Sequence, residues 1–404
     1  ISVNLIDGKY LNVRNYQFFP VVIRNIKING NKINDTNLNL IIQGKINQEK
    51  FYETLLIDKP INGLNDDLKI EVLYSLFGDN KIEKTNVENF SIEFYPTENL
   101  DNYKKYFIQK NGELHNKQLE TIVNETIITP KNMKVVISAG SKIEFKSNGQ
   151  LISLGGISLN GERDKRITIK SSQDAINGGI FVSEAPQTSL VQFTDFENLK
   201  GVMLDNRLIT GCINFYKSNV VIKNSTFHNN FNKDDYINII NSEFEIEDVM
   251  ISYSYADAVD IDFSKGSIKN IKIYSPGNDG IDFSGSNVDL NNVIIKNSKD
   301  KALSVGENSK VKANTVIINN SFIGIAVKDG SKFNADISEM ENNEFDYASF
   351  IKKVEYGSPI LNIDNGPENF NYILGENASM NINGKLYKEN TAEITTNIRD
   401  LLYN

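Results

Sequence analysis

The chain has 404 residues, of which 40% are hydrophobic, so it is long and apolar enough for two or three domains with real cores. Its formal net charge of -9 at pH 7 does not fit the basic footprint of a nucleic-acid-binding protein. No run of 18 apolar residues is present to span a membrane. A single cysteine, Cys212, excludes an internal disulfide framework.

Residues 1–110 predict a small N-terminal antiparallel β domain, built like a sandwich. Segments such as VVIRNIKI and LKIEVLYSLF alternate or run apolar, and turn signals such as Asn29-Gly30 and Gly78-Asp79 separate them. No cluster of His, Cys or carboxylates suggests chemistry there, so we expect an accessory module. The chain opens on Ile1 and carries no recognisable signal peptide, so we expect a processed protein or a fragment.

A repeat of 22 residues dominates the stretch from Asp235 to Asp329. Three apolar columns keep this spacing: Ile237, Val259, Ile281, Leu303 and Ile325; Ile239, Ile261, Phe283, Val305 and Val327; and Ile251, Ile273, Ile295 and Ile317. One polar column also keeps it: Asp248, Asn270, Asn292, Asn314 and Asp336. Self-similarity at a fixed period near 20 residues indicates a stacked solenoid.

Within one repeat, apolar and polar residues alternate over three short runs, which predicts three short strands per turn of the solenoid. The polar column lies between the second and third strands, where stacked Asn side chains bond along the stack. This pattern resembles the right-handed parallel β-helix of the pectate lyase superfamily, over roughly residues 119–346. The resemblance implies an all-β fold with a right-handed parallel β-helix over residues 111–346.

The period is lost after about residue 342. We expect residues 347–404 to form a C-terminal cap, with the closing segment TAEITTNIRDLLYN as an amphipathic helix. Such a cap would cover the open end of the stack, since an uncovered parallel edge invites aggregation.

Acidic residues recur on the first strand of successive turns. Asp260 and Asp282 are predicted to face outward about 4.8 Å apart, because that is the spacing of neighbouring strands. A second column, three residues earlier, consists of Asp235, Asp257, Asp279 and Lys301; Asp262 extends the surface, and Glu307, Lys328 and Asp329 border it. Carboxylates stacked at this spacing need a cation, or their pKa values rise. The sequence therefore predicts a functional site here.

One hypothesis is a calcium-dependent lyase. In pectate-lyase-like enzymes, Asp residues around the first strand hold Ca²⁺, which neutralises a uronate carboxylate and acidifies its α-proton, and a lysine removes that proton. The resemblance implies that Asp235, Asp257, Asp260 and Asp279 are the ligands and that Lys301 is the base.

A second hypothesis is hydrolysis by paired carboxylates. The run SPGNDGIDFSGS resembles the stretch that holds the first catalytic Asp of polygalacturonase-type glycosidases. Asp279 matches that position, and Asp282 is the other candidate catalytic carboxylate. The family's adjacent Asp pair is replaced here by Asp300-Lys301, and its later Gly-His-Gly is absent.

A third hypothesis has no turnover: the patch binds Ca²⁺ structurally, or binds glycan as an adhesin or tail-fibre-like surface protein does. In each case we expect a secreted or cell-surface bacterial protein that binds an acidic polysaccharide and no nucleic acid. The sequence leaves the oligomeric state open. Candidate substrate-binding residues are Asp262, Tyr255, Tyr274, Glu307 and Lys328.

Overall fold

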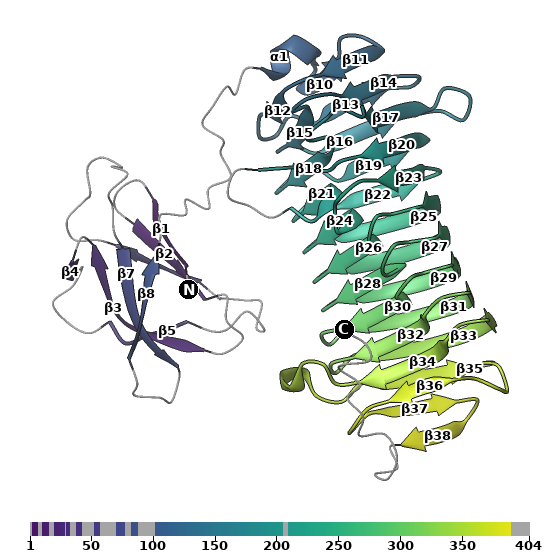
Figure 1. Ribbon diagram of the computed structural model, residues 1–404. Coiled ribbons are helices and arrows are strands. Elements are labelled where there is room, and N and C mark those ends of the chain that lie inside the picture. The colour runs from purple at the N-terminus through teal and green to yellow at the C-terminus, as the bar shows by residue number, and fades with distance from the viewer. Residues whose placement is uncertain are drawn as a thin grey trace. The chain divides into compact units, whose positions relative to one another are not determined.

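The computed structural model describes residues 2–6, 10–15, 20–28, 30–32, 38–42, 52–56, 70–76, 82–87, 102–204 and 209–388. The chain divides into two compact units, Ile1–Thr97 and Glu98–Asn404. Figure 1 labels the elements of both units.

The N-terminal unit consists of two antiparallel sheets. One contains β1 (Ser2–Ile6), β2 (Tyr10–Arg14) and β6 (Tyr52–Leu56). The other contains β3 (Val21–Ile28), β4 (Asn31–Lys32), β5 (Leu40–Ile42), β7 (Ile70–Leu76) and β8 (Glu83–Val87). Val21, Ile23 and Ile26 of β3 are fully buried, and a shift of register between Ile23 and Asn25 interrupts the alternation of the strand. The prediction of a small antiparallel β domain is confirmed.

The second unit is a parallel β-solenoid, as predicted, and one of its faces is an 11-stranded parallel sheet. One strand per turn supplies this first face, which Figure 1 shows as a stack of arrows running from teal to yellow. Its strands are β12 (Thr126–Thr129), β15 (Gln150–Ser153), β18 (Ile180–Ser183), β21 (Gly211–Tyr216), β24 (Asp235–Ile240), β26 (Asp257–Asp262), β28 (Ile281–Ser284), β30 (Lys301–Gly306), β32 (Ile323–Lys328), β34 (Phe345–Phe350) and β36 (Tyr372–Leu374).

The remaining strands of each turn pair in parallel with their equivalents in the next turn. Early turns have two separate strands: β10 (Glu113–Asn116), β11 (Glu120–Val123), β13 (Val135–Ser138), β14 (Lys142–Phe145), β16 (Ile157–Asn160), β17 (Ile167–Ser171), β19 (Ser189–Gln192), β20 (Thr194–Leu199), β22 (Val220–Lys223) and β23 (Thr226–Asn230). In each later turn the two strands are joined into a single bent strand. These long strands are β25 (Glu243–Ser252), β27 (Lys265–Tyr274), β29 (Asn287–Lys296), β31 (Lys310–Asn319) and β33 (Lys332–Glu341).

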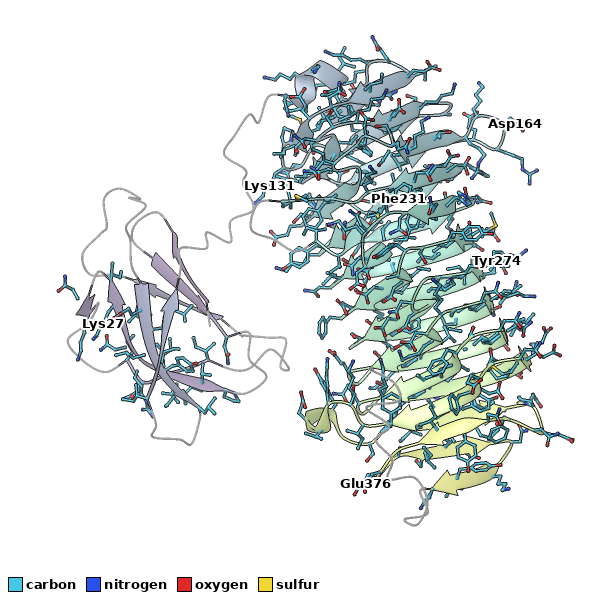
Figure 2. The ribbon with its side chains drawn as sticks, in the orientation of Figure 1. Lys27, Lys131, Asp164, Phe231, Tyr274 and Glu376 are labelled. Atoms are coloured by element: carbon cyan, nitrogen blue, oxygen red, sulfur yellow. The ribbon has the colours of Figure 1, made fainter. Side chains whose placement is uncertain are left out.

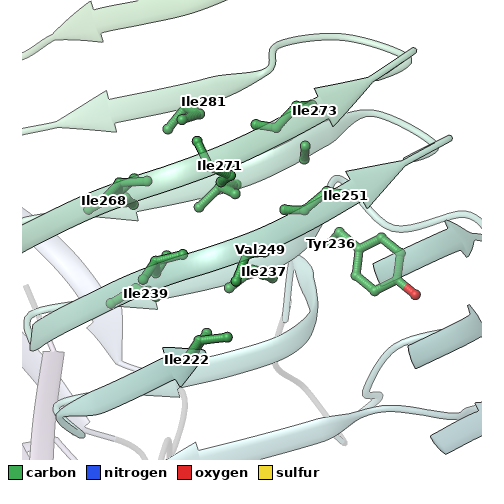
Figure 3. Close-up of a cluster of buried hydrophobic side chains, with 14 of the residues drawn as sticks. Ile222, Tyr236, Ile237, Ile239, Val249, Ile251, Ile268, Ile271, Ile273 and Ile281 are labelled. Carbon is green, nitrogen blue, oxygen red and sulfur yellow. The ribbon is translucent and has the colours of Figure 1, made fainter. Parts of the chain in front are cut away.

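The interior is filled by the apolar columns that the repeat predicts. Ile237, Ile239, Ile251 and Ile273 are fully buried in one cluster, and Figure 3 shows them packed between successive turns. Burying an aliphatic side chain of this size contributes about 1.5–3 kcal/mol to folding. Because each turn packs on the next, the columns hold the acidic strands β24, β26 and β28 in register.

The polar column bends the long strands and forms the predicted ladder. Asp248, Asn270 and Asn292 have φ values of 55°, 54° and 55°, in the left-handed region that Asn and Asp tolerate. The side-chain amide of Asn270 donates to Oδ1 of Asp248 (2.9 Å), and that of Asn292 donates to Oδ1 of Asn270 (2.8 Å).

The strict 22-residue spacing fails between β29 and β31. Asn287 pairs with Lys310 and Ile295 pairs with Ile318, 23 residues later, so Ile317 is not the equivalent of Ile295. The extra residue lies in the turn after β30, and Thr315 takes the left-handed conformation in place of Asn314. The assignments of Ile317 and Asn314 to these columns are therefore wrong by one position.

A second ladder, of buried serines, follows the turn after the first strand. The backbone N–H of each serine donates to the side-chain oxygen of the serine one turn later, at 2.8–3.1 Å. Its members are Ser218, Ser242, Ser264, Ser286, Ser309 and Ser331.

The two ends of the solenoid differ. At the first end, α1 (Tyr103–Tyr106) buries both of its tyrosines, and β9 (Phe107–Lys110) pairs antiparallel with β10. At the other, parallel pairing continues past residue 346 through β35 (Ile360–Asp364) to β37 (Ser379–Ile382), followed by the antiparallel β38 (Lys385–Lys388). The closing helix predicted for residues 391–404 lies outside the described residues. None of the helices in the described ranges has the length and apolar character that crossing a bilayer requires.

Candidate functional site

The acidic residues lie on the outer side of the first face, on three neighbouring strands. Asp260 of β26 is directly opposite Asp282 of β28, and Asn238 of β24 is opposite Asp260 on the other side. Inward neighbours such as Ile261 are fully buried, so the alternation of the strand turns the carboxylates outward. Beyond Asp282 the column continues with Ser304 of β30.

The second acidic column lies where each turn enters the first face. Oδ1 of Asp257 accepts hydrogen bonds from the backbone N–H of Asp279 (2.8 Å) and from the side-chain amide of Asn278 (2.7 Å). Oδ1 of Asp279 accepts one from the backbone N–H of Lys301 (2.9 Å). Asp257 and Asp279 are only 7% and 3% exposed, so each carboxylate also fixes the entry of the next turn.

Three carboxylates converge at this position and form what we call the acidic cluster: Asp257, Asp279 and Asp282. Each offers an oxygen atom, and these oxygens all lie within 4.8 Å of one another. Oδ1 of Asp282 is buried and has no hydrogen-bond partner among the described residues. A buried, unpaired carboxylate oxygen is costly, and carboxylate oxygens are the ligands that Ca²⁺ takes in proteins. The donor set therefore fits a hard divalent cation.

Burial and mutual repulsion disfavour ionisation of four carboxyl groups in this region: Asp235, Asp257, Asp260 and Asp279. Burial, reinforced by the negative charge of Asp279, raises the pKa of Asp257 to about 9. Burial likewise raises the pKa of Asp235 to about 7, and that of Asp260 well above its usual range. Burial raises the pKa of Asp279 to about 6, although the neighbouring Lys301 ammonium opposes the rise.

The structure brings together only part of the predicted calcium ligand set. Asp257 and Asp279 belong to the acidic cluster with Asp282, which sequence analysis placed among the catalytic candidates. Asp235 and Asp260 instead share the side-chain amide of Asn238, which donates to one oxygen of each, at 3.1 Å and 2.8 Å. Asn238 was not predicted as a site residue, although its place in the outward column marks it.

Two predicted lysines lie beside the acidic cluster and are buried. Nζ of Lys301 is 3.5 Å from Oδ1 of Asp279 and also donates to Oδ2 of Asp300. Lys301 is only 3% exposed. Nζ of Lys328 donates to Oγ of Ser304 (2.8 Å), which places its charge one strand away from Asp282.

Glu307 and Asp329, predicted at the border of the patch, hold the segment that follows β34. Glu307 pairs with the ammonium group of Lys353 and accepts a hydrogen bond from the hydroxyl of Tyr356 (3.4 Å). Oδ1 of Asp329 accepts the backbone N–H groups of Lys352 and Lys353, both at 2.6 Å. The sequence pattern does not predict this segment, because it lies outside the repeat.

The tyrosines lie at the turns that enter the first face. Tyr255 is 65% exposed and stands two residues before Asp257, with its backbone N–H bonded to Oδ1 of Asn230 (2.7 Å). Tyr274, which is labelled in Figure 2, is half-buried at the end of β27. Asp262, also half-buried, pairs with Ser284 at the far end of the acidic strands. Tyr255 and Asp262 therefore lie at opposite ends of β26, and Tyr274 lies one turn later, opposite Ser252.

Comparison of the sequence with known proteins identifies no family for this chain. No protein-family model matches the chain, and no curated protein sequence matches it. Membership of the pectate lyase superfamily is therefore not shown.

Some solved structures are weakly similar to the chain. The catalytic domain of a GH87 α-1,3-glucanase variant in complex with tetrasaccharides has 12% identity over 94% of this chain and 87% of its own, with a TM-score of 0.36. The catalytic unit of a thermostable GH87 α-1,3-glucanase from Streptomyces thermodiastaticus has 10% identity over 93% and 89%, with a TM-score of 0.30. A periplasmic alginate epimerase has 12% identity over 69% and 80%, with a TM-score of 0.25. Similarities of this size assign neither a family nor an activity.

Proposed function

We propose that the protein is a secreted or cell-surface protein that binds an acidic polysaccharide through Ca²⁺ held by the acidic cluster. The observation that carries this proposal is the convergence of Asp257, Asp279 and Asp282, whose oxygens lie within 4.8 Å of one another while Oδ1 of Asp282 lacks a partner among the described residues. A cation would favour the charged forms of Asp257 and Asp279 and satisfy the unpaired oxygen of Asp282.

The surroundings supply groups suited to a sugar chain. The exposed ring of Tyr255 presents an apolar face beside the strand that carries Asp257. The outward side chains of Asp262 and Ser284 are polar and line the same face. A glycan lying across β26 and β28 would contact the ion at the centre and the ring at one end.

A lyase reaction is the enzymatic form of this proposal. When bound, Ca²⁺ would neutralise a uronate carboxylate and make the neighbouring α-proton more acidic. Lys301 is the candidate acceptor of that proton, since its Nζ lies beside the cluster. Hydrolysis by the same carboxylates is the other enzymatic form, with a protonated carboxyl as general acid.

One observation favours binding without turnover as the second candidate function. Lys301 is buried, and its ammonium group contacts both Asp279 and Asp300. Proton abstraction would need these contacts to open and the ammonium to lose its proton first. A binding protein needs no such change.

Isothermal titration calorimetry with CaCl₂ tests the shared part of the proposal. The wild-type protein should bind one calcium ion, and Asp282→Asn should lose binding. Asp289→Asn is the matched control, because Asp289 is exposed on β29 and its substitution makes the same charge change. Loss of binding in both variants, or in neither, would contradict a site at the acidic cluster.

Product assays then separate the candidate functions. A lyase releases unsaturated products from polygalacturonate or alginate, detected by ultraviolet absorbance, and Lys301→Ala should abolish them while Lys299→Ala, an exposed neighbour, should not. A hydrolase releases reducing ends without that absorbance. Calcium-dependent glycan binding with neither product identifies a binding protein.

A further inference from the structure

At the ends of β20, β23 and the long strands, the chain turns towards the first face through a corner residue whose φ lies between 52° and 63°. Strand pairing makes these corner residues equivalent from turn to turn; they are Asn198, Asn229, Tyr253, Ser275, Asn297, Asn320 and Asn342. The side-chain amide of Asn229 donates to Oδ1 of Asn198 (2.8 Å), and that of Asn297 donates to Oγ of Ser275 (3.3 Å). The corner therefore favours short polar side chains that bond along the stack.

Tyr253 breaks the pattern of this corner. It is the one residue of the seven that is neither Asn nor Ser, and its φ is 57°. Asn tolerates the left-handed conformation because its short polar side chain bonds locally, whereas a bulky aromatic residue is strained there. Its ring also carries no amide to continue the ladder between Asn229 and Ser275. A strained residue that departs from the rule of its own repeat is typical of a functional position.

The same region gathers exposed aromatic rings. Four aromatic residues of the described ranges are well exposed, and three of them belong to two successive turns: Phe231 (42%), which Figure 2 labels, Tyr253 (58%) and Tyr255 (65%). The fourth, Tyr372, lies at the far end of the solenoid. Exposed apolar side chains that gather in one place, unlike those scattered singly, indicate a binding surface.

Buried polar groups hold both tyrosines of this turn in place. Nδ1 of His228 and Oγ of the buried Ser252 lie 2.9 Å apart in a hydrogen bond. The ring of Tyr253 packs against that imidazole, edge to face, with 5.6 Å between ring centroids. The backbone N–H of Tyr255 donates to Oδ1 of Asn230 (2.7 Å), which is also buried. A turn that is fixed before a ligand arrives lowers the entropy cost of binding.

The next turn of the solenoid packs closely beneath these residues. The backbone N–H of Gly277 donates to the carbonyl oxygen of Ser254 (2.9 Å). A Cβ atom at Gly277 would lie 1.9 Å from the carbonyl oxygen of Tyr255, so only glycine permits this approach. The turn then leads directly into β26, where Asp257 of the acidic cluster follows Tyr253 by four residues.

We propose that Tyr253, together with Tyr255, forms a subsite that binds the apolar C–H face of a pyranose unit of the glycan, next to the acidic cluster. This inference rests on the proposed function in taking the ligand to be a glycan, but it needs no ion. The C–H bonds on one face of a pyranose ring are apolar and pack against the electron-rich face of an aromatic ring. The subsite therefore recognises the ring of the sugar, whereas the acidic cluster recognises its charge.

Calorimetry on the full chain, in CaCl₂, tests the subsite with an oligogalacturonate and an alginate oligosaccharide as probes. The variant Tyr253→Asn supplies the residue found at most of the equivalent corners. It should weaken binding of the preferred probe by about fivefold, through loss of the apolar contact area of the ring. The same variant should raise the urea midpoint, because strain is relieved and ladder bonds to Asn229 and Ser275 can form. Tyr253→Phe keeps the ring and should bind nearly as the wild type does.

Ser275→Asn is the matched control, because it introduces the same residue at the same corner one turn later. It should leave the affinity for both probes unchanged and should not lower the urea midpoint. Wild-type affinity in Tyr253→Asn, equal weakening in Ser275→Asn, or no binding of either probe by the wild type would overturn the subsite. A lower urea midpoint in Tyr253→Asn would overturn it too, since the ring would then serve the fold. So would self-association of the wild type that Tyr253→Asn removes, measured by sedimentation.

Repeating the titrations in EDTA separates this inference from the calcium proposal. Oligosaccharide binding that persists in EDTA and still weakens in Tyr253→Asn would support the subsite and contradict the calcium site. Calcium-dependent binding with wild-type affinity in Tyr253→Asn would support the acidic cluster and overturn the subsite.

Discussion

The backbone N–H of Asp279 donates a 2.8 Å hydrogen bond to Oδ1 of Asp257, one turn earlier in the solenoid. The same geometry repeats between Lys301 and Asp279, at 2.9 Å. These carboxylates are therefore both candidate ligands and structural acceptors. Variants that test their chemistry should keep an acceptor oxygen, as Asn does, because loss of the acceptor would leave a buried N–H unsatisfied.

The first prediction concerns pH. The carboxyl groups of Asp257 and Asp235 have pKa values near 9 and 7 in the folded protein, against about 4 in an unfolded chain. The folded state thus binds more protons than the unfolded state across this interval, so the free energy of unfolding decreases as pH rises. Without divalent cations, we expect it to be highest near pH 4 to 5 and to fall until about pH 9. Urea unfolding at several pH values, in EDTA, measures this slope.

Asp257→Asn provides the control for the pH prediction. It removes the group with the higher of these two pKa values while leaving an acceptor for the N–H of Asp279, so the slope above about pH 7 should become smaller. A wild-type slope that is flat or positive between these pH values would show that the carboxyls ionise normally in the fold.

The second prediction concerns calcium and stability. An ion that binds only the folded state stabilises it by about 2.7 kcal/mol when its free concentration is 100 times Kd. We expect CaCl₂ to raise the urea midpoint of the wild type and of Asp289→Asn, and EDTA to reverse the rise. Asp282→Asn should show no calcium-dependent change, because a neutral amide replaces the carboxylate whose Oδ1 has no partner among the described residues. A calcium effect retained in Asp282→Asn would place the ion elsewhere.

The third prediction concerns the exposed ring at the end of the site. Tyr255→Ala should weaken glycan binding by about 1 kcal/mol, roughly fivefold, through loss of apolar contact area. Tyr255→Phe should bind nearly as the wild type does, since the ring face is retained. Because the side chain is 65% exposed, neither change should alter the free energy of unfolding by more than a few tenths of a kcal/mol. Equal affinities of wild type and Tyr255→Ala would exclude the ring from the binding surface.

The fourth prediction concerns the polar ladder. Asn270→Ala removes two ladder hydrogen bonds and forces alanine to keep a φ of 54°. The left-handed conformation alone costs about 1–2 kcal/mol for an ordinary residue, so we expect a loss of about 2–3 kcal/mol in urea unfolding. Asn291→Ala, an exposed strand position in the next turn, should cost much less. Similar losses in the two variants would mean that the ladder adds nothing specific.

The solenoid could be predicted because each turn packs on a nearly identical turn, so one packing requirement recurs as a column of residues. The prediction failed at Ile317 for an equally physical reason. Val316, Ile317 and Ile318 are consecutive apolar residues, so an extra residue in the preceding turn leaves the column looking intact. The pairing of β29 with β31, such as that of Ile295 with Ile318, reveals the shift.

The site was predicted to the extent that it belongs to the repeat. The register of β26 and β28 follows from the 22-residue period, and so does the stacking of Asp260 on Asp282. The segment that follows β34 could not be found in this way, because it lies outside the repeat and Asp329 anchors it across turns. Which carboxylates point toward one another also depends on side-chain hydrogen bonds, such as those of Asn238, that the spacing does not reveal.

The serine ladder yields the last prediction, and here the sequence held a signal that was overlooked: serine recurs at 22–24 residue intervals next to the first strand. Oγ of Ser264 accepts the N–H of Ser242 (3.0 Å) and donates to the carbonyl oxygen of Asp262 (2.8 Å). Ser264→Ala should cost about 1–3 kcal/mol, because it leaves the buried N–H of Ser242 without a partner. Ser267→Ala, exposed on β27, is the matched control and should change stability by less than about 0.5 kcal/mol. Because Ser264 lies in the turn directly after β26, the variant should also weaken calcium binding if the ladder sets the position of that strand. Unchanged calcium affinity together with lower stability would show that the ladder supports the fold without positioning the site.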